Sequence, residues 1–225
     1  MTAMNNKQYS RVTAVSSVST AVKTWRLCTV MTVLAMATAG CGSVRYPRTY
    51  ALDLDGGIVT TPLRPTSLGT LAVRDFACPD YLCDGRIVYR PTRTEVGYYE
   101  YHRWAMTLRR MITDSVVSRV RAGGAFTVVE PSQHAAGGAY VLTGAIERLE
   151  EVDDGRDVQA LVTLSAELVD MRAHTTVWRH SEIASEPVRT RDVAHVVNSL
   201  SVATRRAIDA LVASLESHVA SDTMQ

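Results

Sequence analysis

A short apolar run that ends at a cysteine separates an N-terminal segment from the part of this chain that can fold as a domain in water. Residues 27–39 are mostly apolar, and the stretch MTVLAMATAGCGS at residues 31–43 carries no charged side chain. A membrane-spanning helix needs roughly 20 apolar residues, so about a dozen is too short to span comfortably. The segment before the run has no acidic residue but four basic ones, Lys7, Arg11, Lys23 and Arg26. This order is typical of a secretory signal, which we expect to occupy residues 1–40.

The cysteine that closes the run is Cys41, and the small residues Ala39 and Gly40 precede it. This end of the run resembles a bacterial lipobox, in which an aliphatic residue, a small residue and Gly or Ala lead to Cys. Thr38 departs from the pattern, because leucine is usual there. The resemblance implies that the Cys41 thiol receives a diacylglycerol, that cleavage makes Cys41 the new N-terminus, and that a further acyl chain is then added. The alternatives are an ordinary cysteine after an ordinary secretory signal, and an uncleaved anchor.

Three acyl chains would hold the protein firmly on a membrane, since each buried methylene contributes about 0.8 kcal/mol. Gly42 follows the cysteine. In enterobacterial lipoproteins an aspartate at this place retains the protein in the inner membrane. By resemblance, its absence favours the outer membrane, with the protein on the periplasmic face.

Composition limits what the mature chain can be. Residues 41–225 are enough for one domain with a full core. The formal net charge is +1, so the chain lacks the basic footprint of a nucleic-acid-binding protein. We expect residues 41–66, which contain three prolines and the run TYALDLD, to form the acylated N-terminus and a tether with one short strand. Residues 67–220 then form the domain.

Two cysteines remain in the mature domain, Cys78 and Cys83, in the loop sequence FACPDYLCDGR. In an oxidising envelope this spacing favours a disulfide, which would contribute about 2 kcal/mol by closing a small loop. Free thiols are the second interpretation. A metal or redox site is less favoured, because no further cysteine pair or nearby histidine supplies ligands, and a redox motif would have two intervening residues.

The spacing of apolar residues gives the order of elements. Alternating patterns predict a strand near residues 68–77, a hairpin around RPTRT at residues 90–94, a short strand at residues 126–131, and a three-strand meander that begins at residue 139. A three-and-four spacing predicts one helix from Trp104 to the glycines at 123 and 124, and another from about Arg191 to His218. We therefore predict an α+β domain whose antiparallel sheet carries two helices on one face.

Catalytic signatures are missing from the sequence. There is no G-x-S-x-G turn and no glycine-rich phosphate loop, and the six histidines are not paired at helical metal spacing. The acidic cluster ERLEEVDDGRD is best interpreted as a solvated hairpin tip. We predict no enzyme activity, no catalytic residue, no metal and no cofactor.

The most informative segment is VGYYEYHRWAM, which brings four aromatic residues to a strand-to-helix junction. Trp104 and two tyrosines either pack the helix onto the sheet or present a surface to a ligand or partner. Neighbouring strand residues point to opposite sides. Tyr98, Tyr99 and Tyr101 therefore cannot all be buried on one face, and at least one should be available for binding.

The run from residue 81 to residue 112 resembles the ABC-type transport auxiliary lipoproteins, the family of the paraquat-inducible protein C lipoproteins. In that family a strand ending P-x-Y-L leads through a hairpin to Y-x-x-x-R-W. The matching residues in this chain are Pro79, Tyr81, Leu82, Tyr99, Arg103 and Trp104. The lipobox, YALDL, the meander and the closing helix extend the resemblance over nearly the whole mature chain.

This resemblance implies a non-enzymatic lipoprotein that serves an MCE-type lipid transport system. An MCE-domain protein would bridge the periplasm, driven by an inner-membrane ATPase that is not part of this chain. The expected partners are the MCE-domain protein, the membrane, a transported lipid and a second copy of the chain. The alternative is an assembly factor for an outer-membrane barrel or a lipopolysaccharide-assembly-like complex.

We predict that Cys41 is acylated and is the first residue of the mature protein. Cells supplied with a fatty-acid probe should label the wild-type protein, and the Cys41→Ser variant should lose the label because it lacks the thiol. Gel fluorescence and intact mass measure the outcome. Label retained by Cys41→Ser would contradict the prediction.

Overall fold

The computed structural model describes residues 45–55, 68–132, 138–153 and 155–222. The signal sequence and Cys41 lie outside the described residues. The chain divides into two units, Met1–Arg45 and Tyr46–Gln225, and the second contains every element described below.

The antiparallel meander consists of β6 (Tyr140–Asp153), β7 (Val158–Asp170) and β8 (Thr175–Pro187). β6 and β7 are joined by a tight turn in which Gly155 has φ 87°, a value that favours glycine. The side chain of Asp153 accepts a hydrogen bond from the Gly155 amide at 2.8 Å. Alternate residues along β7 are buried: Val158, Ala160, Val162, Leu164, Ala166 and Leu168. The predicted alternation therefore holds along this strand, except that Thr163 on the opposite side is buried as well.

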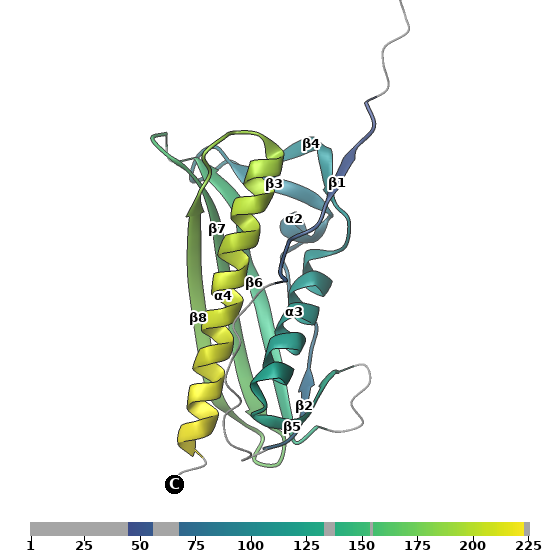
Figure 1. The fold of residues 1–225 in the computed structure, drawn as a ribbon, viewed down its shortest axis with the longest axis vertical. Coiled ribbons are helices and arrows are strands. Elements are labelled where there is room, and N and C mark those ends of the chain that lie inside the picture. Colours follow the sequence, from purple (N-terminus) through teal and green to yellow (C-terminus); the bar gives the residue numbers. More distant parts are fainter. Residues whose placement is uncertain (1–44, 56–67, 133–137, 154, 223–225) are drawn as a thin grey trace, which may run out of the picture. The chain divides into compact units, whose positions relative to one another are not determined.

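The other edge of β6 pairs with two strands that follow each other along it. Both β2 (Leu68–Val73) and β3 (Arg86–Arg90) run parallel to β6, one at each end. Between them, Ala77 bridges Ala145. β2 and β3 therefore lie one after the other along the same edge of the long strand β6, with an interruption between them (Figure 1).

Three more strands, each shorter than β6, complete the sheet. β4 (Gly97–Trp104) is antiparallel to β3, which confirms the predicted hairpin, while β1 (Arg48–Tyr50) is parallel to β4 and β5 (Phe126–Pro131) is parallel to β2. The α+β class is confirmed, and the eight described strands form a mixed sheet rather than one that is antiparallel throughout. Alternation within a strand identifies its buried face but not the direction of its neighbour, which is why the parallel pairs were missed.

The interruption between β2 and β3 contains α2 (Asp80–Cys83) and the two cysteines. Their sulfur atoms are joined in the structure, and their Cα atoms lie 6.0 Å apart, within the range that disulfides require. A disulfide here would close a small loop in the segment that connects β2 with β3. The pairing of Cys78 with Cys83 in the cell envelope stays a prediction.

The long helices α3 (Leu108–Gly123) and α4 (Val193–Asp222) lie beside each other on one face of the sheet (Figure 1). α3 begins after Thr107, whose side chain accepts a hydrogen bond from the Arg110 amide, as an N-cap does. Trp104 is consequently the last residue of β4 and not part of the helix as predicted. Its side chain is 7% exposed, in the core between the helices and the sheet.

The glycine pair that ends α3 has two separate physical roles. Gly124 is the C-cap residue and has φ 72°, in the left-handed region. At Gly123 a Cβ atom would lie 1.5 Å from Oε1 of Glu216, so the carboxyl group of α4 occupies the space where a side chain would be. Glu216 is buried, and its Oε1 has no hydrogen-bond partner among the described residues.

We predict that Trp104→Ala lowers the free energy of unfolding by about 3 to 5 kcal/mol, because removing a buried indole leaves a cavity. Urea titration followed by circular dichroism measures the change. Tyr46→Ala is the control, since Tyr46 is 81% exposed and should change stability by less than about 0.5 kcal/mol. Equal stability of Trp104→Ala and wild type would contradict the core assignment.

Glu216 gives a second prediction, on pH. Burial raises the pKa of Glu216 above its ordinary value of 4.5. The folded state therefore opposes ionisation of this carboxyl group, and the wild type loses stability as the pH rises from about 4.5 through the raised pKa. Glu216→Gln has no group to ionise here. It should match the wild type near pH 4 and be the more stable protein at pH 8.

Unfolding in urea at a series of pH values tests this expectation. The exposed Glu100 supplies the control variant Glu100→Gln, which also removes one negative charge. If the difference between Glu216→Gln and wild type were the same at every pH, the buried carboxyl would not be responsible.

Candidate functional site

The aromatic junction predicted from the sequence lies on β4, close to the hairpin with β3. Tyr101 is the most exposed of its three tyrosines, at 39%, while Tyr98 and Tyr99 are half-buried and pack against the core. The guanidinium carbon of Arg86 lies 3.6 Å from the centre of the Tyr98 ring, within the range of a cation–π contact. The Tyr99 hydroxyl donates a hydrogen bond to the carboxylate of Glu151. The junction thus has one exposed tyrosine and two half-buried ones.

The strict alternation assumed for this strand does not hold. Arg86 pairs with Arg103, and only two residues further on Val88 pairs with Tyr98, so the ladder is irregular between these pairs. A bulge of this kind turns side chains away from their alternating sides. Tyr99 and His102 consequently meet, with ring centres 5.9 Å apart, and His102 also stacks on Tyr50 of β1 at 5.6 Å.

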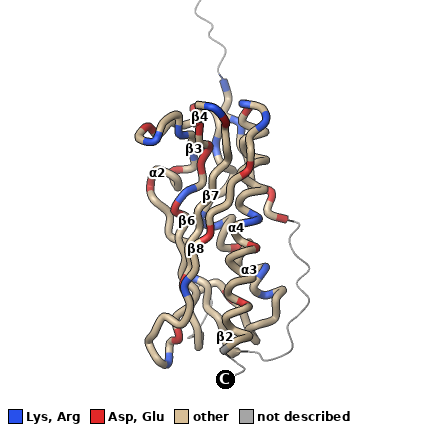
Figure 2. Tube along the Cα trace, turned by 90° about the vertical axis from the view of Figure 1, so that its left-hand side faces the viewer, with Lys and Arg blue, Asp and Glu red and all other residues tan. Residues whose placement is uncertain are grey.

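Charged side chains from β3 and β6 support the junction. Glu150 is fully buried and accepts hydrogen bonds from Nε of Arg90 at 3.0 Å and Nε of Arg148 at 2.7 Å. A buried carboxylate with two guanidinium partners is compensated, whereas an unpaired one would be costly. Basic and acidic residues occur together around β3 and β4 (Figure 2). This network fixes the end of the sheet on which the tyrosines lie.

Tyr99 and Glu151 are also buried enough that the pKa of each group is shifted. Burial raises the pKa of Tyr99, and the hydrogen bond to Glu151 raises it further. Burial likewise raises the pKa of Glu151. At neutral pH Tyr99 is a neutral hydrogen-bond donor, and its hydroxyl stabilises the strand rather than acting as a nucleophile.

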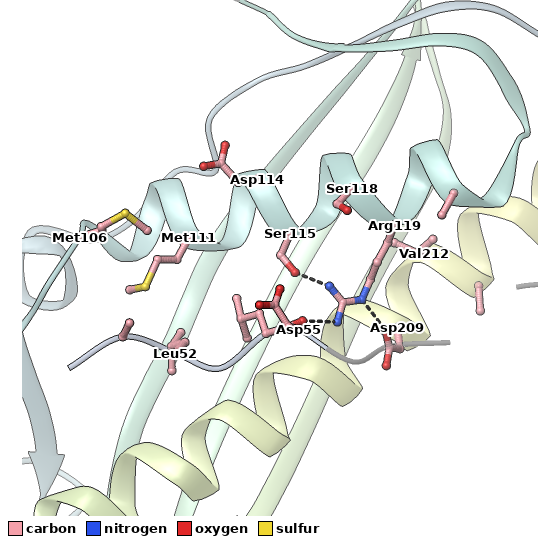
Figure 3. A pocket seen from close by; sticks show the side chains of 14 residues that line it. Leu52, Asp55, Met106, Met111, Asp114, Ser115, Ser118, Arg119, Asp209 and Val212 are labelled. Carbon is pink, nitrogen blue, oxygen red and sulfur yellow. Dashed lines mark hydrogen bonds and ion pairs between the residues drawn. The ribbon is translucent and has the colours of Figure 1, made fainter. Parts of the chain in front are cut away.

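A second candidate site lies between the two long helices. A cavity of about 410 Å³ is bounded by α3, α4 and residues 51–55, which we call the strap (Figure 3). Its apolar lining comes from all three, and includes Leu52 and Leu54 of the strap, Met111 of α3, Val212 of α4, and Met106 just before α3. The volume is in the range of small-molecule sites, about 300 to 1,000 Å³.

Arg119 of α3 connects the three walls of this cavity. Its Nε donates to Asp209 of α4 at 2.5 Å, one terminal nitrogen donates to the carbonyl of Leu54 at 3.0 Å, and the other donates to the hydroxyl of Ser115. Figure 3 shows the guanidinium between the helix and the strap. Each of its nitrogens is therefore engaged within the protein.

The strap is fixed to α4 by further polar contacts. The hydroxyl of Ser201 accepts a hydrogen bond from the Asp53 amide at 3.0 Å, and Arg205 donates to the carbonyl of Asp55 at 3.2 Å. Leu52 is 7% exposed. Residues 46–55 of the predicted tether thus belong to the same compact unit as the domain. This cavity was not predicted from the sequence, in which the run TYALDLD indicates only one short strand within a tether; the alternation of Leu and Asp in that run is the signal of a segment with one apolar side.

Signs of metal binding or membrane insertion are absent from the described residues. There, no group of three or more His, Cys, Asp or Glu side chains is arranged to hold a metal ion. Of the helices within those same ranges, none has the length and apolar character to cross a membrane. Cys41, the predicted lipidation site, lies outside the described residues and stays a prediction.

Comparison with known proteins identifies the family. A model of the ABC-type transport auxiliary lipoprotein component matches residues 50–213. The chain belongs to this family. The match runs from the last residue of β1 into α4 and so includes both candidate sites. The family consists of lipoproteins that assist transport, which agrees with the predicted non-enzymatic, membrane-anchored role at this coarser level.

Solved structures with a similar fold come from proteins of low sequence identity. Protein XCC0632 from Xanthomonas campestris superposes with a TM-score of 0.68 at 23% identity, covering 79% of this chain and 99% of the other. An uncharacterized protein superposes with a TM-score of 0.59 at 15% identity, covering 76% and 99%. No curated protein matches this chain. At these identities the likeness shows the fold alone.

Proposed function

We propose that this lipoprotein is the outer-membrane auxiliary component of an MCE-type lipid transport system. Acylated Cys41 anchors it to the inner leaflet, the domain faces the periplasm, and the far end of an MCE-domain protein docks on it. The family match over residues 50–213 is the observation that carries the proposal. The predicted signal sequence and lipobox support the anchor.

The docking surface that we propose is the aromatic junction around Tyr101. Tyrosines are frequent at interfaces, because they provide a large contact area and keep a polar tip for water. On the neighbouring strands β3 and β6, Glu150 is held by Arg90 and Arg148, so docking on this sheet would order few side chains there.

The position of β1 supports a docking surface that lies near the membrane. β1 pairs with β4 between Arg48 and His102, next to Tyr101. Arg48 lies seven positions after Cys41 in the sequence, with six residues between them. A chain of that length spans at most about 25 Å when fully extended. If Cys41 carries the lipid, the aromatic junction stays within reach of the membrane, where an MCE protein would have to arrive.

We predict that Tyr101→Ala weakens capture of the MCE-domain partner about tenfold and leaves stability within about 0.5 kcal/mol of wild type, because its side chain is exposed. Crosslinked envelopes from cells with the acylated protein, immunoblotted for the MCE protein, give the capture yield. Thermal unfolding of the same variants gives stability.

The matched control is Tyr46→Ala, which removes a tyrosine that is 81% exposed and lies outside the strands of the sheet. Tyr99→Ala should differ from both, because it leaves buried Glu151 without its donor and lowers stability by about 1 to 3 kcal/mol. Unchanged capture by Tyr101→Ala would place the docking surface elsewhere. Failure of the wild-type protein to capture any MCE-domain protein would overturn the proposed function.

A further inference from the structure

The cavity between α3, α4 and the strap has walls that match an apolar ligand. Leu52, Leu54, Met111 and Val212 line its interior, and Met106 is 49% exposed beside it. Methionine side chains are unbranched and polarisable, so they adapt to ligands of varying shape. In Figure 3 the two methionines lie together at one end of the cavity, with the guanidinium of Arg119 further along α3.

The polar groups of the lining limit what can bind. Arg119 is the cation in the lining, and each of its nitrogens already donates to Asp209, Ser115 or Leu54. Three of the five N–H donors of the guanidinium are thus used within the protein, which leaves Arg119 little capacity to hold a polar ligand. Burying a polar group without a partner is costly, whereas an alkyl chain needs none. An alkyl chain therefore fits this cavity better than a sugar, a nucleotide or a polar peptide does.

The charges around the cavity distinguish between sources of an alkyl chain. The lining contains three carboxylates, Asp55, Asp114 and Asp209, against the single guanidinium of Arg119. Arg110 lies outside the lining and pairs with Asp114 at 3.2 Å. Beside the strap, Arg205 pairs with Asp53 at 3.3 Å and so adds one charge of each sign. With both pairs included, four carboxylates face three guanidinium groups. Such a rim repels the carboxylate of a free fatty acid and attracts an ammonium group.

We propose that this cavity binds one acyl chain of a phospholipid whose head group carries an ammonium ion, as in phosphoethanolamine lipids. A volume of about 410 Å³ suits one chain rather than a whole two-chain lipid, so the second chain and the head group stay outside. The binding site follows from the cavity itself, and its role as a lipid-handling site rests on the proposed function. The strap, which continues from the segment after Cys41, forms one wall of the site.

Photolabelling of the full acylated protein in vesicles tests this proposal. The vesicles contain phosphatidylglycerol, whose head group has no ammonium ion, and a trace of phosphatidylethanolamine with a diazirine on one acyl chain. A parallel arm replaces the probe with a diazirine fatty acid. After irradiation, mass spectrometry of peptides locates the label. We expect it on the peptides containing Met106, Met111 and Val212, with several-fold less label from the fatty acid.

Variants that fill the cavity make the test specific. Ala213 lines the cavity and is exposed on α4, so Ala213→Phe should obstruct the site without disturbing the core and reduce labelling about tenfold. Ala194→Phe is the matched control, because Ala194 is an exposed alanine of the same helix outside the lining and should label as wild type does. If Ala213→Phe does not fold, Ser118→Trp on α3 obstructs the same cavity from an exposed position.

Three results would overturn the inference: equal labelling of the filled variant and wild type, label confined to peptides outside the cavity, or equal labelling by the fatty acid. Partner capture measured on the same preparations separates this inference from the proposed function. Capture of the MCE-domain protein without cavity labelling overturns the lipid site alone. Labelling of the cavity without capture supports the lipid site and counts against the proposed partner.

Discussion

The long strand β6 is the constraint on which the rest of this domain depends. One edge of β6 pairs with β7 along its whole length, and the other edge pairs with β2 at one end and β3 at the other. Every strand of the described sheet is connected to β6 directly or through one of these neighbours. Because a one-residue slip would turn all its side chains to the wrong face, this shared register also fixes where the core residues point.

The positions of the two candidate sites depend on β6. One lies at the end of β6 near β3, and the other lies on the helical side of the sheet. At its end near β3, the adjacent residues Glu150 and Glu151 point to different partners, one to two arginines and the other to Tyr99. These contacts position the aromatic junction on β4. On the helical side, α4 packs against β7 and β8 and leaves α3 beside it, so the cavity forms where the two helices and the strap meet. A single scaffold thus supplies a rigid polar surface and an apolar cavity.

The sequence predicted those features that depend on local chemistry. The glycine pair marks the end of α3, and alternation identifies the buried face of β7, because each depends on only a few neighbouring residues. The start of α3 was placed too early because Trp104, a core residue of a strand, also fits the helical spacing. The parallel pairing of β2 and β3 with β6 was not predicted because it joins residues 69 and 62 positions apart in sequence, and no local pattern encodes that contact.

The cavity was not predicted because one of its walls, the strap, belongs to a segment that the sequence indicates as a tether. The strap also connects the two candidate sites. A tether rich in proline and glycine is typical of a flexible spacer, yet residues 51–55 are bound by Arg119 of α3 and by Ser201 and Arg205 of α4. β1, immediately before it, contributes only three residue pairs to the sheet. So short a strand is marginal on its own, and the side-chain contacts of the strap are needed to keep it in register. The same segment therefore reaches from the aromatic junction to the cavity, and its attachment to the helices stabilises both.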